Sequence, residues 1–159
     1  MNRIRTGVVG VGALGRHHLR WLSQIPESEL VGFYDVDPEK QQKYAAEYNV
    51  TAFPTVEALA KKVQAVSIVV PTTIHHEVAS TLLARGVHCL IEKPVTSTLE
   101  EANDLTGLAS RSGARVAVGH IERFNPAVQA VLELGCRPAF IEAHRLAAFD
   151  PRGADVAVV

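Results

Sequence analysis

Residues 4–15 read IRTGVVGVGALG, a β-rich apolar run that passes directly into the glycine spacing GxGxxG. Each glycine in this spacing has a physical task. Gly10 permits a tight turn, Gly12 lets the backbone approach a pyrophosphate, and Gly15 lets the next helix pack close to the strand. The first turn of that helix, with Ala13 and Leu14, offers N–H groups and the positive end of a dipole to phosphates. The stretch therefore predicts a dinucleotide-binding turn between a strand and a helix.

An acidic residue, Asp35, stands 20 residues beyond Gly15, directly after the apolar run 30–34. A carboxylate there can accept hydrogen bonds from the ribose 2′-OH of NAD and repels the 2′-phosphate of NADP. Neither Arg nor Lys occupies the next three positions. The sequence predicts NAD in preference to NADP. The alternative is an incidental glycine-rich turn followed by a solvated aspartate.

Short apolar runs alternate with helical patterns through the first three quarters of the chain. Strands are expected at 4–9, 30–34, 65–70, 87–91 and 115–119, and helices at 17–22, 38–48, 77–85 and 99–110. This alternation is typical of βαβ units around a parallel sheet, and right-handed crossovers place helices on both faces. The predicted fold is α/β, a Rossmann doubly wound parallel sheet, with the NAD-binding domain over residues 1–119.

The rhythm changes after Gly119. Residues 120–135, HIERFNPAVQAVLELG, predict a connecting loop and a helix that ends at Gly135. Residues 138–146 are a strand candidate, and the apolar run ADVAVV follows at 154–159. Residues 120–159 are expected to form a linker helix and the first strand of an incomplete, truncated C-terminal α/β substrate domain.

The composition is that of one ordinary globular domain. The 159 residues are 47% hydrophobic and 21% charged, with a net charge of −1. That balance provides no electrostatic footprint for nucleic acid, and no apolar run approaches the length of a membrane span. Cys89 and Cys136 predict buried thiols in a reducing compartment, and we expect a cytoplasmic protein. The histidines lack metal-ligand spacing, so no metal site is expected.

The tripeptide Glu92-Lys93-Pro94 lies at the carboxyl end of the fourth expected strand. Ligands bind at that edge of an open parallel sheet. A lysine there can supply a cation and a proton donor or acceptor beside the cofactor. The alternative for Lys93 is an ordinary surface lysine in a loop.

Four segments together resemble the Gfo/Idh/MocA family of nicotinamide-dependent dehydrogenases, which act on sugars, sugar nucleotides and inositols. They are GVVGVGALGRHH at 7–18, VVPTTIHHEVA at 69–79, EKP at 92–94 and GHIERFNPAV at 119–128. The resemblance runs in order along the whole chain. It implies that Lys93 is a catalytic or substrate-orienting residue that also lies, with Glu92, at the cofactor.

The same resemblance implies that Pro71, Thr72 and His75 lie in a loop that contacts the cofactor, although many relatives carry Asn where this chain has Thr72. The segment 119–127 and the run HRLAAFDPRGADV at 144–156 resemble the subgroup that oxidises the 3-hydroxyl of UDP-N-acetylglucosamine or its uronic acid. His120, Arg123 and Asn125 are then substrate-binding candidates, Arg because it pairs with phosphate or carboxylate. For Asn125 the alternative is a helix cap before proline.

Family members carry an acidic residue and a histidine just beyond the point where this chain ends. The resemblance therefore implies a chain that binds NAD but turns over poorly, and a homo-oligomer when the protein is complete. The expected reaction is hydride transfer between a sugar hydroxyl carbon and nicotinamide. Two alternatives stay open: a dehydrogenase of inositol or a free aldose, and a non-catalytic NAD-binding module.

Overall fold

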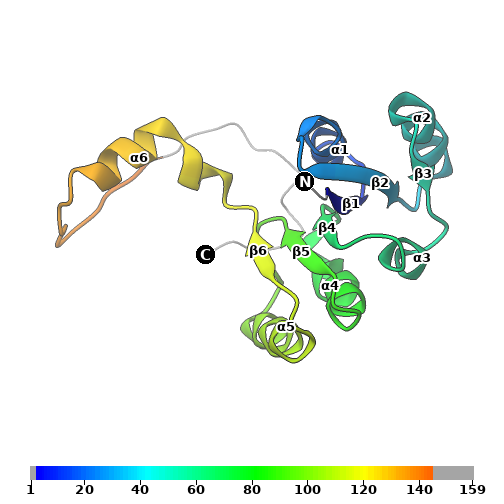
Figure 1. The fold of residues 1–159 in the computed structure, drawn as a ribbon. Helices are drawn as coiled ribbons and strands as arrows, with labels where there is room; N and C mark the ends of the chain where they lie inside the picture. The colour runs from blue at the N-terminus through cyan, green and yellow to red at the C-terminus, as the bar shows by residue number, and fades with distance from the viewer. Residues whose placement is uncertain (1–2, 145–159) are drawn as a thin grey trace.

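In the computed structural model, residues 3–144 are described. Six parallel strands form one sheet in the order β3-β2-β1-β4-β5-β6, and helices cover both of its faces (Figure 1). The strands are β1 Ile4–Val9, β2 Ser28–Tyr34, β3 Thr51–Ala52, β4 Ala65–Ile68, β5 His88–Ile91 and β6 Val116–Val118. The predicted doubly wound parallel sheet is confirmed.

The α-helices are α1 Gly15–Gln24, α2 Pro38–Tyr48, α3 Val56–Ala60, α4 His75–Leu83, α5 Leu99–Ser112 and α6 Pro126–Glu133. Two short 3-10 helices, η1 Thr72–Ile74 and η2 Ile121–Phe124, precede α4 and α6. Because the strand order reverses direction at β1, right-handed crossovers carry α1 and α2 to one face and α4 and α5 to the other (Figure 1).

The core has two parts, one on each face of the sheet. Successive residues of β1 point to opposite faces, so Val8 packs with Leu19 and Phe33 under α1 and α2, while Val9 packs into the larger cluster of the other face. Each of these side chains is essentially removed from water. Such burial stabilises the fold by about 1.5–3 kcal/mol for each large apolar side chain.

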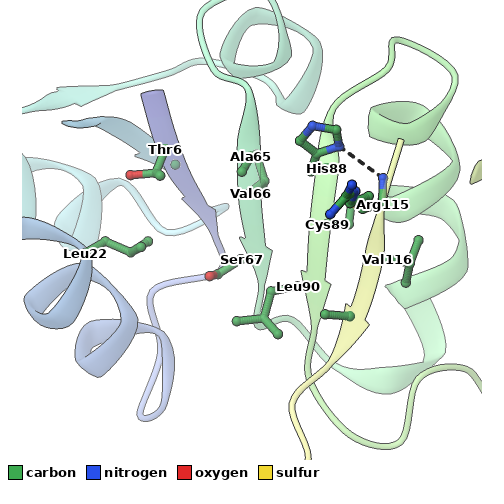
Figure 2. A pocket seen from close by; sticks show the side chains of 12 residues that line it. Thr6, Leu22, Ala65, Val66, Ser67, His88, Cys89, Leu90, Arg115 and Val116 are labelled. Carbon is green, nitrogen blue, oxygen red and sulfur yellow. Dashed lines mark hydrogen bonds between the residues drawn. The ribbon is translucent and has the colours of Figure 1, made fainter. Parts of the chain in front are cut away.

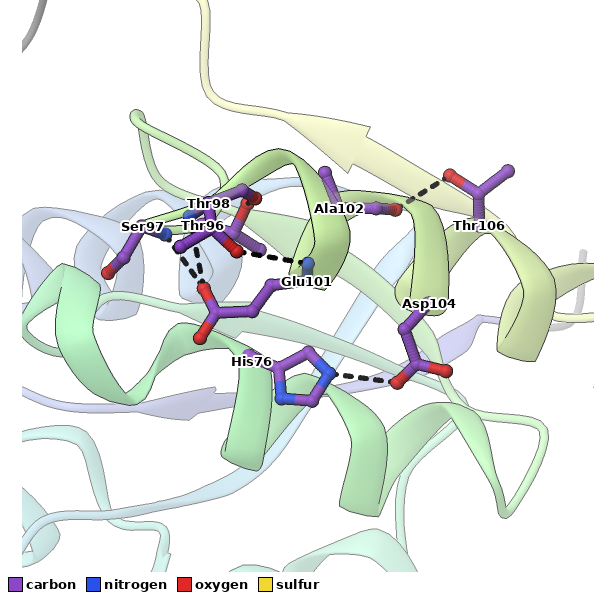
Figure 3. Close-up of polar contacts among 8 residues, drawn as sticks. All are labelled: His76, Thr96, Ser97, Thr98, Glu101, Ala102, Asp104 and Thr106. Carbon is purple, nitrogen blue, oxygen red and sulfur yellow. Dashed lines mark hydrogen bonds and ion pairs between the residues drawn. The ribbon is translucent and has the colours of Figure 1, made fainter.

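Polar side chains set where α5 begins and how it meets α4. Thr98 accepts a hydrogen bond from the Glu101 N–H at 3.2 Å, and the Glu101 carboxylate accepts from the Thr98 N–H, which is a capping box (Figure 3). His76 on α4 lies 2.8 Å from the Asp104 carboxylate on α5 (Figure 3). The capping box sets the start of α5, and the contact between His76 and Asp104 connects α5 to α4.

The structure adds a strand and an α-helix that the sequence patterns did not predict, β3 and α3. β3 has two residues and lies at the edge of the sheet, and α3 has five residues, so neither is long enough to show a periodic pattern. Of the strand expected at 138–146, residues 138–144 are described, and they contain no strand; residues 145–146 lie outside the described part. Every residue of 138–144 is exposed, and an isolated strand without a partner is not stable.

The cysteine prediction is half correct. Cys89 on β5 is buried, and burial raises the pKa of its thiol to about 12. Cys136 is exposed, because the chain from His120 through 144 lies on the outside of the sheet domain (Figure 1). The prediction that both thiols are buried is therefore wrong for Cys136.

The contact between Gly15 and the Gly10 carbonyl generates a prediction about stability. A Cβ built on Gly15 would lie 1.9 Å from the Gly10 oxygen, a backbone atom that cannot rotate away. We expect Gly15→Ala to lower the free energy of unfolding by about 3 kcal/mol or more, because the first turn of α1 must shift off β1. Denaturant unfolding measures the change.

The matched control for Gly15→Ala is Gly113→Ser, in the turn after α5. Gly113 has a φ of +71°, but an added Cβ there meets nothing within 4 Å. We expect Gly113→Ser to lower the free energy of unfolding by about 1 kcal/mol, because the only penalty is a side chain at a positive φ. Equal losses of stability in the two variants would show that the close approach at Gly15 is not what holds the turn.

Candidate cofactor site at the carboxyl edge of the sheet

The candidate site lies where the two halves of the sheet diverge. β1 pairs with β2 on one side and with β4 on the other, and the helices that follow these strands cover opposite faces. In open parallel sheets, this reversal of strand order opens a crevice at the carboxyl ends of the strands, where ligands bind. The glycine turn follows β1 at this point.

The glycine turn combines a tight backbone with open space. Gly10 has a φ of +85°, and its N–H donates to the Tyr34 carbonyl at 2.8 Å. A Cβ on Gly12, in contrast, would meet no atom within 4 Å. The turn is therefore closed toward the sheet at Gly10 and Gly15 and open toward the edge at Gly12.

The N-terminus of α1 carries no side-chain cap and no acidic residue in its first turn. The N-termini of α2, α3, α5 and α6 are capped by Asp37, Thr55, Thr98 and Asn125. α4 has no side-chain cap either, but the 3-10 helix η1 leads directly into it. Uncapped N–H groups at a helix start need another acceptor, and an anion fits them. The start of α1, next to the open side of Gly12, therefore has the properties of a phosphate site.

Asp35 lies at the end of β2 and is 7% exposed. One carboxylate oxygen accepts a hydrogen bond from the Val11 N–H at 2.6 Å, and the other accepts from the Asp37 N–H at 2.9 Å. The carboxylate thus connects β2 to the glycine turn, a role that the spacing alone did not reveal. Each oxygen has a second lone pair, so Asp35 can also accept a hydrogen bond from a ribose hydroxyl.

Two charged side chains follow Asp35 at the start of α2. The Asp37 carboxylate accepts from the Glu39 and Lys40 N–H groups at 2.9 Å and 3.3 Å, which caps the helix. The Lys40 ammonium lies 3.2 Å from the same carboxylate. The hydrogen bond to Lys40 lowers the pKa of Asp37, and the hydrogen bond to Asp37, followed by the charge of Asp35, raises the pKa of Lys40.

His75 connects the loop after β4 to the turn after β5. Its ring is buried, with one nitrogen 2.9 Å from the Val70 carbonyl oxygen and the other 3.0 Å from the Pro94 carbonyl oxygen. The side chain therefore points into the protein. Thr72 in the same loop is buried too, whereas Pro71 is exposed.

Glu92 lies between α1 and the ends of β5 and β6. Its carboxylate is 3.3 Å from His18 Nε2 and accepts from the Lys93 N–H at 3.2 Å. A Cβ on Gly119 would lie 2.8 Å from that carboxylate, so Gly119 leaves the space that Glu92 occupies. Burial lowers the pKa of His18, and the charge of Glu92 opposes that shift. The Lys93 side chain is exposed at this edge.

The three candidates after β6 are all exposed: His120, Arg123 and Asn125. The Asn125 amide oxygen accepts from the Ala127 N–H at 2.9 Å and its nitrogen donates to Glu122 at 2.8 Å. Asn125 is therefore the N-cap of α6, as the helix-cap alternative predicts.

A hollow elsewhere on the sheet does not belong to this edge. It lies over β4, β5 and β6 on the face that α1 only borders, and Leu22, Ser67 and Leu90 are among its lining residues (Figure 2). On the side of the hollow away from Leu22, the His88 ring accepts a hydrogen bond from the Arg115 N–H at 3.0 Å (Figure 2). The hollow is mostly apolar and shares no residue with the glycine turn.

Within residues 3–144, no three His, Cys, Asp or Glu side chains lie together in a way that could hold a metal ion. No helix in this part of the chain has both the length and the apolar character needed to cross a membrane.

Comparison with known proteins identifies a family whose sequence pattern this chain matches. The model of an oxidoreductase family with an NAD-binding Rossmann fold, Gfo/Idh/MocA, matches residues 4–120. UDP-N-acetylglucosamine 3-dehydrogenase of Acidithiobacillus ferrooxidans is 46% identical over the whole chain, which covers 50% of that protein. A solved structure of that enzyme has a TM-score of 0.80 and 47% identity, over 85% of this chain and 44% of that one.

Two more distant relatives also match this chain over part of their length. Glucose-6-phosphate 3-dehydrogenase of Bacillus subtilis is 30% identical over 76% of this chain and 34% of that protein. Biliverdin reductase of Synechocystis, solved with biliverdin and NADP+, is 27% identical with a TM-score of 0.76, over 83% of this chain and 43% of that one. The chain thus spans half or less of the length of these relatives.

The two hydrogen bonds of Asp35 generate a prediction. Asparagine at this position can accept only through its oxygen, so one buried N–H loses its acceptor. We expect Asp35→Asn to lower the free energy of unfolding by about 1–3 kcal/mol and to weaken NADH binding at least about tenfold. Denaturant unfolding and NADH fluorescence titration measure the two effects.

The matched control for Asp35→Asn is Asp104→Asn on α5. Asp104 is half-exposed and its contact with His76 bridges two helices away from the edge. Its loss should change stability by no more than about 1 kcal/mol. The role of Asp35 in the turn is disproved if both variants are equally stable.

Proposed function

The chain belongs to the Gfo/Idh/MocA oxidoreductase family, and from that membership we propose that it is the cofactor-binding half of an NAD-dependent sugar-nucleotide dehydrogenase. The observation that carries the proposal is the open glycine turn at the uncapped start of α1, braced from the side by Asp35. This combination of a strand, a turn and a helix accommodates a dinucleotide pyrophosphate and its ribose side by side.

The residues at the edge fit NAD in three places. The pyrophosphate would lie over Gly12, where a Cβ has open space, and against the N–H groups of Ala13, Leu14 and Gly15 at the start of α1. The ribose next to adenine would lie beside Asp35, whose carboxylate can accept hydrogen bonds from the ribose hydroxyls. When bound, NAD supplies the hydride acceptor.

The loops after β4 and β5 complete the cofactor side of the site in this proposal. Pro71 and Thr72 border the cofactor through the loop backbone. His75 acts indirectly, because its buried ring holds that loop against Pro94. Glu92 acts in the same indirect way and positions the turn that carries Lys93.

The substrate we propose is UDP-N-acetylglucosamine or a related UDP-sugar, oxidised at C3. Two relatives support this choice, since both are named as 3-dehydrogenases, one of that sugar nucleotide and one of a sugar phosphate. Lys93 is exposed at the cofactor edge, where it can hold or accept the proton of the reacting hydroxyl. His120 and Arg123 would contact the substrate, and Asn125 would do so while capping α6.

The cofactor part of the proposal is tested on the chain itself. We expect NADH to bind more tightly than NADPH in a fluorescence titration, because Asp35 and Asp37 repel a 2′-phosphate. Gly12→Ala should weaken NADH binding at least about tenfold without loss of thermal stability, because its new methyl group enters space that only the ligand fills. Equal or tighter NADPH binding would contradict the proposed preference.

The catalytic part requires a substrate domain. Residues 1–159 joined to the second half of the Acidithiobacillus relative form a chimera in which UDP-N-acetylglucosamine oxidation can be followed as NADH formation. We expect Lys93→Ala to lower kcat by about a hundredfold or more, the usual contribution of a positioned acid–base group. Lys62→Ala, at an exposed lysine near the opposite edge, is the control. Equal rates for the two variants would remove Lys93 from the reaction.

A further inference from the structure

The start of α2 places a cation beside the carboxylate that is proposed to bind the ribose. The Lys40 ammonium lies 3.2 Å from Asp37, and the negative charge of Asp35 contributes to raising the pKa of Lys40. The Asp35 carboxylate accepts a hydrogen bond from the Asp37 N–H at 2.9 Å, so all three side chains belong to the same turn at the start of α2. A 2′-phosphate on a ribose bound at Asp35 would enter the field of all three side chains.

Of these three side chains, Asp35 is the one that can least change its contacts. Both of its oxygens accept hydrogen bonds from backbone N–H groups, and its backbone carbonyl accepts from the Gln41 side chain at 2.5 Å. Its side chain is almost fully buried. Any change at Asp35 disturbs the glycine turn as well as the ribose contact.

Asp37 and Lys40 are in the opposite situation. Their side chains are 36% and 43% exposed, and an exposed ion pair contributes little to stability. A phosphate monoester carries a charge of about −1.5 to −2 at neutral pH, so it competes well for a lysine ammonium that no carboxylate holds. The pair can thus change partners at little cost to the fold.

We propose that the Asp37–Lys40 ion pair sets the choice between NAD and NADP in this chain. Asp37 holds the Lys40 ammonium at the helix start and adds a second negative charge to that of Asp35, so a 2′-phosphate meets two carboxylates and a cation that is already paired. Lys40 is a latent phosphate ligand. This inference rests on the proposed cofactor function and assigns its selectivity to two residues outside the glycine turn.

The test is the ratio of the NADPH and NADH dissociation constants, measured by fluorescence titration of the chain. Asp37→Ser keeps a hydroxyl that can cap α2 but removes the carboxylate from Lys40. We expect the ratio to fall about tenfold or more in Asp37→Ser, and the fall to diminish at high salt, where charges are screened. The double variant Asp37→Ser/Lys40→Ala should show less than about a third of that fall in the ratio, because it lacks the cation.

Two results would overturn the inference. One is a ratio of dissociation constants that does not change in Asp37→Ser, and the other is a fall in that ratio that is equally large in the double variant. Thermal unfolding verifies that each variant is folded, and Asp37→Asn, which also caps helices well, replaces Asp37→Ser if the serine variant is not. Failure of the proposed function is seen separately. In that case the parent chain binds neither nucleotide, and the inference falls with it.

Discussion

The close approach of α1 to the end of β1 is the constraint on which the rest of the site depends. Gly15 lies against the Gly10 carbonyl with no room for a side chain, and Gly10 takes a backbone conformation that other residues avoid. These two glycines turn the chain sharply enough for α1 to pack on the sheet while its first turn faces the carboxyl edge. The proposed phosphate site is a consequence of that packing.

Three polar side chains hold the edge together, and each connects segments that are distant in the sequence. Asp35 connects β2 to the glycine turn, His75 connects the loop after β4 to the turn after β5, and Glu92 connects α1 to that same turn. All of these contacts are made between residues of the chain itself, and they preorganise the edge for the proposed cofactor. Preorganisation of this kind reduces the entropy that binding must overcome.

Patterns along the chain predicted most of the sheet domain, and their failures have physical causes. The long strands and helices were predicted because each buries a periodic set of apolar side chains, as Leu19 and Phe33 do. β3 was missed because two residues carry no period, and it forms only because β2 offers it an edge. The strand expected at 138–146 is absent from 138–144, because apolar residues alone do not provide a partner strand.

The sequence by itself determined the fold class, the position of the glycine turn and the acid that follows β2, because glycine spacing and strand periodicity act over short distances. Only the tertiary structure decided what each polar side chain is free to do. It showed that the His75 ring faces inward, that Asp35 braces the turn and that Asp37 holds Lys40. For His75 and Asp35 the reason is that a hydrogen bond needs a partner within about 3 Å, and folding brings that partner from a distant part of the chain.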